Sequence, residues 1–176
     1  MGINDLTKPM NQIFKKIYKA SPKINNFKFL LLIKQQNINF AFLNYQIINN
    51  IMKVAYIFKT NMASTFQLAT MILPQLEQNT HGVEVVGMFF FDENANVLRK
   101  GNETGERLNK VAKERGMLIM ACDQCALRRD LADGDFDQCG TGNVQPKNMI
   151  EVGQVGCFPQ LYSSLGGNMP NLVITL

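Results

Sequence analysis

The sequence lacks the glycine patterns that bind nucleotide phosphates, and it contains a single histidine. Its glycines match neither the phosphate loop nor the dinucleotide-binding fingerprint. The turn expected after the first strand, residues 60–64, has no glycine at all, so we do not expect nucleotide binding there. His81 lies in a turn far along the chain from the cysteines, which favours a solvated turn residue over a metal ligand.

Long apolar runs are also missing from the N-terminal segment. Its longest, Phe29–Ile33, is far too short to span a bilayer, and no small-residue cleavage site follows an apolar region as in a secretory signal. Four cysteines without an export signal indicate a reducing compartment, so we expect a cytoplasmic protein with no membrane partner. In that setting cysteine spacing more often indicates catalysis, sulfur handling or metal binding than a disulfide framework.

Acidic residues are scarce at the beginning of the chain. Residues 1–51 hold seven lysines, no arginine and one acid, Asp5, whereas residues 52–176 hold 11 basic and 13 acidic residues. The basic balance therefore belongs to the first segment and does not indicate a nucleic-acid partner for the rest. Asn, Lys, Ile and Phe make up 30 of those 51 residues. We interpret residues 1–51 as a non-native or disordered extension before a start at Met52; the alternative is a genuine basic arm or membrane-surface segment.

From Met52 onward, expected strands alternate with expected helices. Helix periodicity and helix-stop residues such as Gly116 define the helices, and Pro74 should kink or end the first of them. The alternation predicts one α/β domain over residues 52–176, with a mainly parallel five-stranded sheet covered on both faces. The expected strands are 53–59, 83–91, 117–121, 149–152 and 172–176, and the expected helices are 63–78, 104–115, 122–131 and 158–165.

The most informative motif is the pair Cys122 and Cys125, at the junction of the strand 117–121 and the helix after it. A helix N-terminus favours a thiolate, and open α/β sheets bind ligands where their strands end. We expect Cys122 to be the more activated thiol and Cys125 to be a resolving thiol on the same helix face. Arg128 and Arg129, one turn later, would favour a thiolate or bind an anionic group. The alternative is that both cysteines are small buried hydrophobes.

Two further cysteines leave a metal site open. Four thiolates could hold zinc or an iron–sulfur cluster. Structural zinc ribbons usually supply two closely spaced cysteine pairs, and neither Cys139 nor Cys157 has a paired cysteine nearby. We therefore expect no metal or other cofactor, and we keep as the alternative a site made of Cys122, Cys125, Cys139 and Cys157.

Residues 122–129, Cys-Asp-Gln-Cys-Ala-Leu-Arg-Arg, resemble the motif of the DsrE/DsrF-like (TusD-type) sulfur-relay family. In that family a cysteine precedes an Ala-Leu-Arg-Arg helix at the same offset. Residues 85–98 are similar to the family's second strand and its loop, and residues 155–176 to its closing helix and strand. The resemblance covers residues 52–176 and is nearest to a cysteine-rich, SaoD-like subgroup.

The resemblance implies a three-layer α/β/α domain, commonly assembled into trimers or hexamers, that carries sulfane sulfur as a cysteine persulfide. Only Cys122 matches the sulfur-carrying position, and Cys125 stands where typical members have a small residue such as alanine. The expected function is that of a sulfurtransferase-like carrier with sulfur-donor and sulfur-acceptor proteins as partners. Cycling of a disulfide between the two cysteines, metal binding, and a non-catalytic role in a hetero-oligomer remain alternatives.

Overall fold

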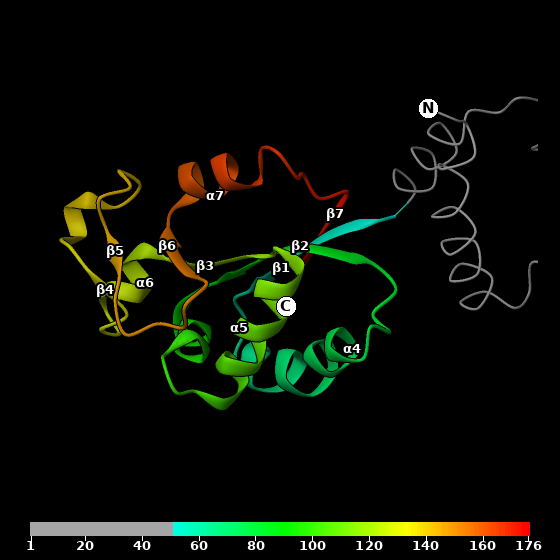
Figure 1. The fold of residues 1–176 in the computed structure, drawn as a ribbon. Helices are drawn as coiled ribbons and strands as arrows, with labels where there is room; N and C mark the ends of the chain where they lie inside the picture. Colours follow the sequence, from blue (N-terminus) through cyan, green and yellow to red (C-terminus); the bar gives the residue numbers. More distant parts are fainter. Residues whose placement is uncertain (1–50) are drawn as a thin grey trace, which may run out of the picture. The chain divides into compact units, whose positions relative to one another are not determined.

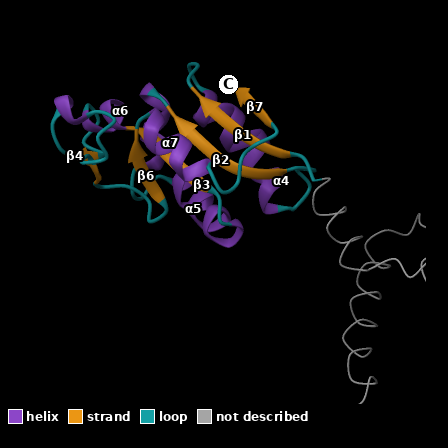
Figure 2. Ribbon diagram, turned by 90° about the horizontal axis from the view of Figure 1, so that it is seen from above, coloured by secondary structure: helices purple, strands orange, loops and turns teal. Residues whose placement is uncertain are grey.

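A computed structural model describes residues 51–176 (Figure 1); the predicted N-terminal extension, apart from its last residue, lies outside them. Five strands form one sheet in which every pairing is parallel. Helices cover both faces of this sheet, so the predicted three-layer α/β/α fold is confirmed (Figures 1 and 2). In spatial order the strands are β6 (Gly153–Gly156), β3 (Leu118–Cys122), β2 (Glu84–Phe90), β1 (Lys53–Phe58) and β7 (Leu172–Thr175).

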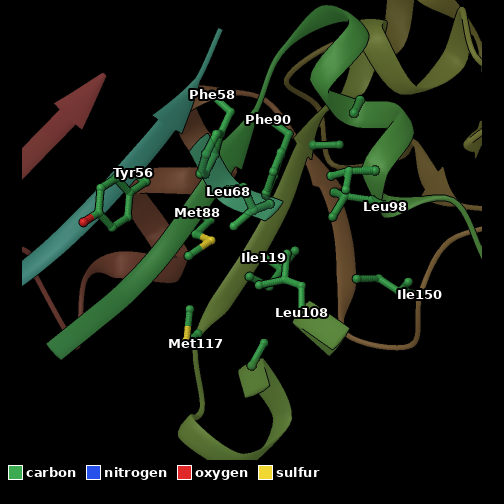
Figure 3. Close-up of a cluster of buried hydrophobic side chains, with 14 of the residues drawn as sticks. Tyr56, Phe58, Leu68, Met88, Phe90, Leu98, Leu108, Met117, Ile119 and Ile150 are labelled. Atoms are coloured by element: carbon green, nitrogen blue, oxygen red, sulfur yellow. The ribbon is translucent and has the colours of Figure 1, made fainter. Parts of the chain in front are cut away.

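The core lies between the sheet and the helices on one of its faces (Figure 3). Strand β2 is buried along all but its first residue, as its continuous apolar sequence predicts for a central parallel strand. Phe58 of β1 and Phe90 of β2 are fully buried, and their rings stack with centroids 4.7 Å apart. Phe58 and Phe90 are partners in the parallel register of β1 and β2, and Phe90 ends β2 two residues before Asp92.

The helices of that face follow the predicted ranges closely. The predicted helix 63–78 is continuous but begins as a π-helix, η2 (Ala63–Ile72), and becomes α-helical as α4 (Leu73–Glu77). The winding changes next to Pro74, which has no N–H to donate. The helix therefore continues past Pro74 but changes from π-helical to α-helical geometry there. Helix α5 (Glu103–Arg115) stops at Gly116 in the left-handed conformation, as predicted.

The predicted strand 149–152 is wrong, because the fourth strand is β6, four residues further on. Met149 forms only an isolated bridge with Arg99, and Ile150 is buried in the core. This apolar stretch therefore packs under the sheet, and a less apolar, glycine-flanked segment pairs with β3 instead. The closing elements, α7 (Phe158–Leu165) and β7, lie where the sequence predicts them.

The segment between β3 and β6 forms a small subassembly beside the sheet (Figure 1). The predicted helix 122–131 is shorter than expected, since α6 (Asp123–Leu127) is followed by a turn with Asp130 at a positive φ of 53°. A two-stranded antiparallel ribbon follows, made of β4 (Ala132–Asp133) and β5 (Gln145–Pro146).

The second face of the sheet is covered more thinly. Helix α7 lies over it, and a groove of about 210 Å³ lined mainly by apolar side chains remains beside the helix over β1 and β2. Two aromatic side chains at the rim, Phe158 and Tyr162, are exposed. None of the described helices is both long and apolar enough to cross a bilayer.

Candidate functional site

All four cysteines lie at the carboxyl end of the sheet, the side on which the parallel strands finish. Cys122 is the last residue of β3 and pairs with Gly156, the last residue of β6. Cys157 follows at once, so two cysteines 35 positions apart in the sequence stand on neighbouring strand ends. Cys125 lies in α6, and Cys139 follows the short helix η4 (Phe136–Gln138).

The first group, which we call the thiol pair, consists of Cys122 and Cys125. Cys122 is partly exposed, whereas Cys125 is buried with 6% of its surface accessible. The Sγ atom of Cys125 lies 3.8 Å from Oδ1 of Asp92, a long contact to the second residue after β2. The pair therefore joins one partly exposed cysteine to one buried cysteine.

The two thiols shift each other's pKa in opposite directions. Hydrogen bonding with Cys122 lowers the pKa of Cys125 to about 7, although burial acts against this. The same interaction, together with burial, raises the pKa of Cys122. These shifts run opposite to the predicted order, in which the helix N-terminus makes Cys122 the more acidic thiol. Helix α6 has only five residues, too few for a strong macrodipole, and the neighbouring sulfur dominates.

The two arginines that follow have different surroundings. Arg129 is mostly buried, donates from Nη1 to the carbonyl oxygen of Cys125 at 3.1 Å, and forms an ion pair with Glu93 at 2.7 Å. Its charge contributes to the low pKa of Cys125. The guanidinium of Arg128 instead stacks over the ring of Phe136, 5.2 Å from its centroid. Of the two predicted supporting residues, Arg129 is therefore the one held beside the thiol pair.

The second group, which we call the acid–thiol cluster, consists of Asp123, Cys139 and Cys157. Their ligand atoms, one carboxylate oxygen and two sulfurs, all lie within 4.8 Å of one another. Cys139 donates to Oδ1 of Asp123 at 3.2 Å. This bond to an anionic oxygen, reinforced by burial and by Cys157, raises the pKa of Cys139 to about 12.

The cluster differs from the four-cysteine site kept as the alternative to no metal. Among the described residues it is the single group of three or more potential metal ligands that approach this closely, and it includes neither Cys122 nor Cys125. Asp123, which is 2% exposed, is the member of the cluster that cysteine spacing does not indicate. One signal was available: an acidic residue directly after a fully apolar strand and inside a Cys-x-x-Cys motif.

Comparisons with known proteins add a likeness of fold at low similarity. A scan against protein-family models and a search of curated proteins found no match. Among solved structures, the chain is similar to the ychN protein from E. coli, with 11% sequence identity and a TM-score of 0.47. The alignment covers 72% of this chain and 99% of that one. At this similarity, the roles of the cysteines must be argued from the chain's own geometry.

Proposed function

We propose that the protein is a sulfur-relay protein that accepts sulfane sulfur on Cys122 as a persulfide and passes it to a partner thiol. One observation carries this proposal: a partly exposed cysteine stands at the end of a parallel strand, hydrogen-bonded to a buried cysteine whose pKa is lowered to about 7. The motif of residues 122–129, which resembles that of the sulfur-relay family, supports the same assignment.

The lowered pKa of Cys125 supports a role for its thiolate as the base in this transfer. The Cys125 thiolate takes the proton of Cys122 while the Cys122 sulfur attacks the outer sulfur of a donor persulfide. A sulfur–sulfur bond forms on Cys122, the corresponding bond in the donor breaks, and the donor leaves as a thiolate. The number of sulfur–sulfur bonds and the total charge are unchanged, so this step needs no oxidant or reductant. The expected partners are a sulfur-donor and a sulfur-acceptor protein.

The buried position of Cys125 also supports a second outcome. Its thiolate can attack the inner sulfur of the Cys122 persulfide, release hydrosulfide and form a disulfide between the two cysteines. In that reaction the sulfane sulfur gains two electrons and the two thiols lose them, so an external dithiol must reduce the disulfide before the next cycle. The chain then acts as a dithiol redox protein in addition to a carrier.

The experiment that tests the relay is uptake of isotopically labelled sulfane sulfur from a persulfidated donor protein. Replacing Cys122→Ala should reduce uptake to background, because the accessible nucleophile is lost. A matched variant, Cys157→Ala, removes a partly exposed thiol from the neighbouring strand end and should leave uptake near the wild-type level. Equal uptake by the Cys122→Ala variant and the wild type would exclude Cys122 as the acceptor.

A further inference from the structure

The acid–thiol cluster takes no part in the proposed relay and has a ligand set of its own. Its three members come from three segments: Asp123 begins α6, Cys139 follows η4, and Cys157 precedes α7. All three ligand atoms lie within 4.8 Å of one another. Zinc bonds of about 2.0–2.3 Å to oxygen and sulfur place tetrahedral ligands within roughly 4 Å of one another. A small inward movement of the side chains therefore suffices to coordinate one ion.

Asp123 is a buried acid without a positively charged partner. It is 2% exposed, and within residues 51–176 no lysine or arginine forms an ion pair with it. Its oxygens accept hydrogen bonds from the backbone N–H groups of Gln124 and Gly140, at 2.7 and 2.8 Å, and from the thiol of Cys139. Buried charges in proteins are ordinarily paired with a counter-charge or bound to a metal. A divalent cation would supply the missing positive charge.

Hydrogen bonds outside the cluster hold its segments together. The Gln160 side chain accepts from the Cys157 N–H at 3.1 Å and donates to the Gly140 carbonyl at 2.8 Å. Gly140 in turn donates to Asp123. A Cβ atom on Gly156 would lie 2.8 Å from Cβ of Gln160, so glycine is required there for Gln160 to approach. Such supporting contacts orient the ligands of metal sites.

We propose that Asp123, Cys139 and Cys157 bind one zinc ion, with water as the fourth ligand. Carboxylate and thiolate groups are ligands that zinc accepts in tetrahedral sites. The ion replaces the thiol protons of Cys139 and Cys157, both of which pass to solvent, and no group changes oxidation state. Bound zinc links three segments beside the thiol pair: the start of α6, the loop that carries Cys139, and the start of α7. Cys122 and Cys125 are not ligands and stay free for sulfur chemistry.

The test is a zinc titration of the reduced, metal-free, full-length protein against a chromophoric chelator. We expect one zinc ion per chain. Cys139→Ser, Cys157→Ser and Asp123→Asn should each weaken binding by more than the roughly 10- to 100-fold that loss of a supporting hydrogen bond costs. Cys122→Ser, the matched control at the same end of the sheet, should bind zinc as the wild type does. Cobalt substitution should give thiolate-to-metal absorption that persists in Cys122→Ser and is lost in Cys157→Ser.

Circular dichroism of each metal-free variant separates loss of a ligand from loss of the fold. Asp123→Asn, which keeps the side-chain shape, serves as the second variant if a cysteine replacement does not fold. Absence of stoichiometric zinc binding by the folded wild type would overturn the proposal. So would an equal loss of binding in Cys122→Ser, which would indicate a site shared with the thiol pair.

Discussion

The thiol pair and the acid–thiol cluster lie at the same end of one sheet, yet their surroundings give their sulfurs opposite properties. In the thiol pair, a neighbouring thiol and the charge of Arg129 favour an anion on Cys125, whose pKa falls to about 7. In the cluster, the carboxylate of Asp123 keeps the proton on Cys139, whose pKa rises to about 12. The hydrogen-bond partner of each thiol, more than burial, therefore decides that Cys125 becomes the more acidic cysteine and that Cys139 keeps its proton.

The largest expected effect comes from removing the carboxylate of the acid–thiol cluster, Asp123. Asp123→Ala should lower the free energy of unfolding by about 2–3 kcal/mol, because it leaves the partly buried N–H groups of Gln124 and Gly140 without their acceptor. Urea denaturation of the metal-free protein measures this change. Asp137→Ala, at an exposed position on η4, should change the unfolding free energy by less than about 0.5 kcal/mol. Equal effects of the two variants would contradict the structural role of Asp123.

The second prediction concerns the release of sulfur from Cys122. Cys125→Ala should slow hydrosulfide release from a Cys122 persulfide by at least about tenfold, because the adjacent nucleophile that can attack it is gone. Hydrosulfide is measured after excess donor has been removed. Cys139→Ala, which removes a thiol from the cluster, should release hydrosulfide at the wild-type rate. If Cys125→Ala and the wild type release it equally fast, Cys125 is not a resolving thiol.

The third prediction concerns the pH at which a thiolate forms. In a metal-free Cys139→Ser/Cys157→Ser variant, ultraviolet thiolate absorbance should rise as the pH increases through about 7, the pKa of Cys125. The pKa is lowered, so the anion is present above this pH and is lost below it. Adding Cys122→Ala removes the main cause of the shift and should move the midpoint up toward about 8.5. An unchanged midpoint would mean that the neighbouring sulfur does not set this pKa.

The smallest expected effect comes from the arginine beside the thiol pair. Arg129→Gln should raise the midpoint of the same titration by less than about one pH unit, since its charge contributes less than Cys122 does. Arg128→Gln should leave the midpoint where it is, because that guanidinium stacks on Phe136. If Arg128→Gln shifted the titration midpoint more than Arg129→Gln did, Arg128 and not Arg129 would be the arginine that lowers the pKa of Cys125.

Local patterns in the sequence predicted most of the fold. The apolar run that becomes β2, the glycine that ends α5 and the segment that becomes α7 each act through neighbours close in the chain. The fourth strand was predicted at residues 149–152 because that stretch is apolar. Ile150 is apolar because it fills the core, not because it belongs to a strand. Periodicity alone does not distinguish a strand from a short buried connection.

The candidate site also has one part that local sequence predicted and one part that it did not. Cys122 and Cys125 lie in one motif, so the sequence alone indicated the thiol pair. The cluster depends on the parallel pairing of β3 with β6, which brings Cys157 to Cys122 and Asp123 and could not be derived from spacing. The order of the two pKa values also depended on a contact between side chains, which the sequence did not reveal.

The most direct test of the account is to map labelled sulfur on the wild-type protein. The reduced, zinc-loaded chain is incubated with a sulfane-sulfur donor labelled with a heavy isotope, and peptides are then sequenced by mass spectrometry. The account predicts one added sulfur atom on Cys122, or a Cys122–Cys125 disulfide with labelled hydrosulfide released, and no label on Cys139 or Cys157. Label carried by Cys139 or Cys157, with Cys122 unmodified and no such disulfide, would contradict it.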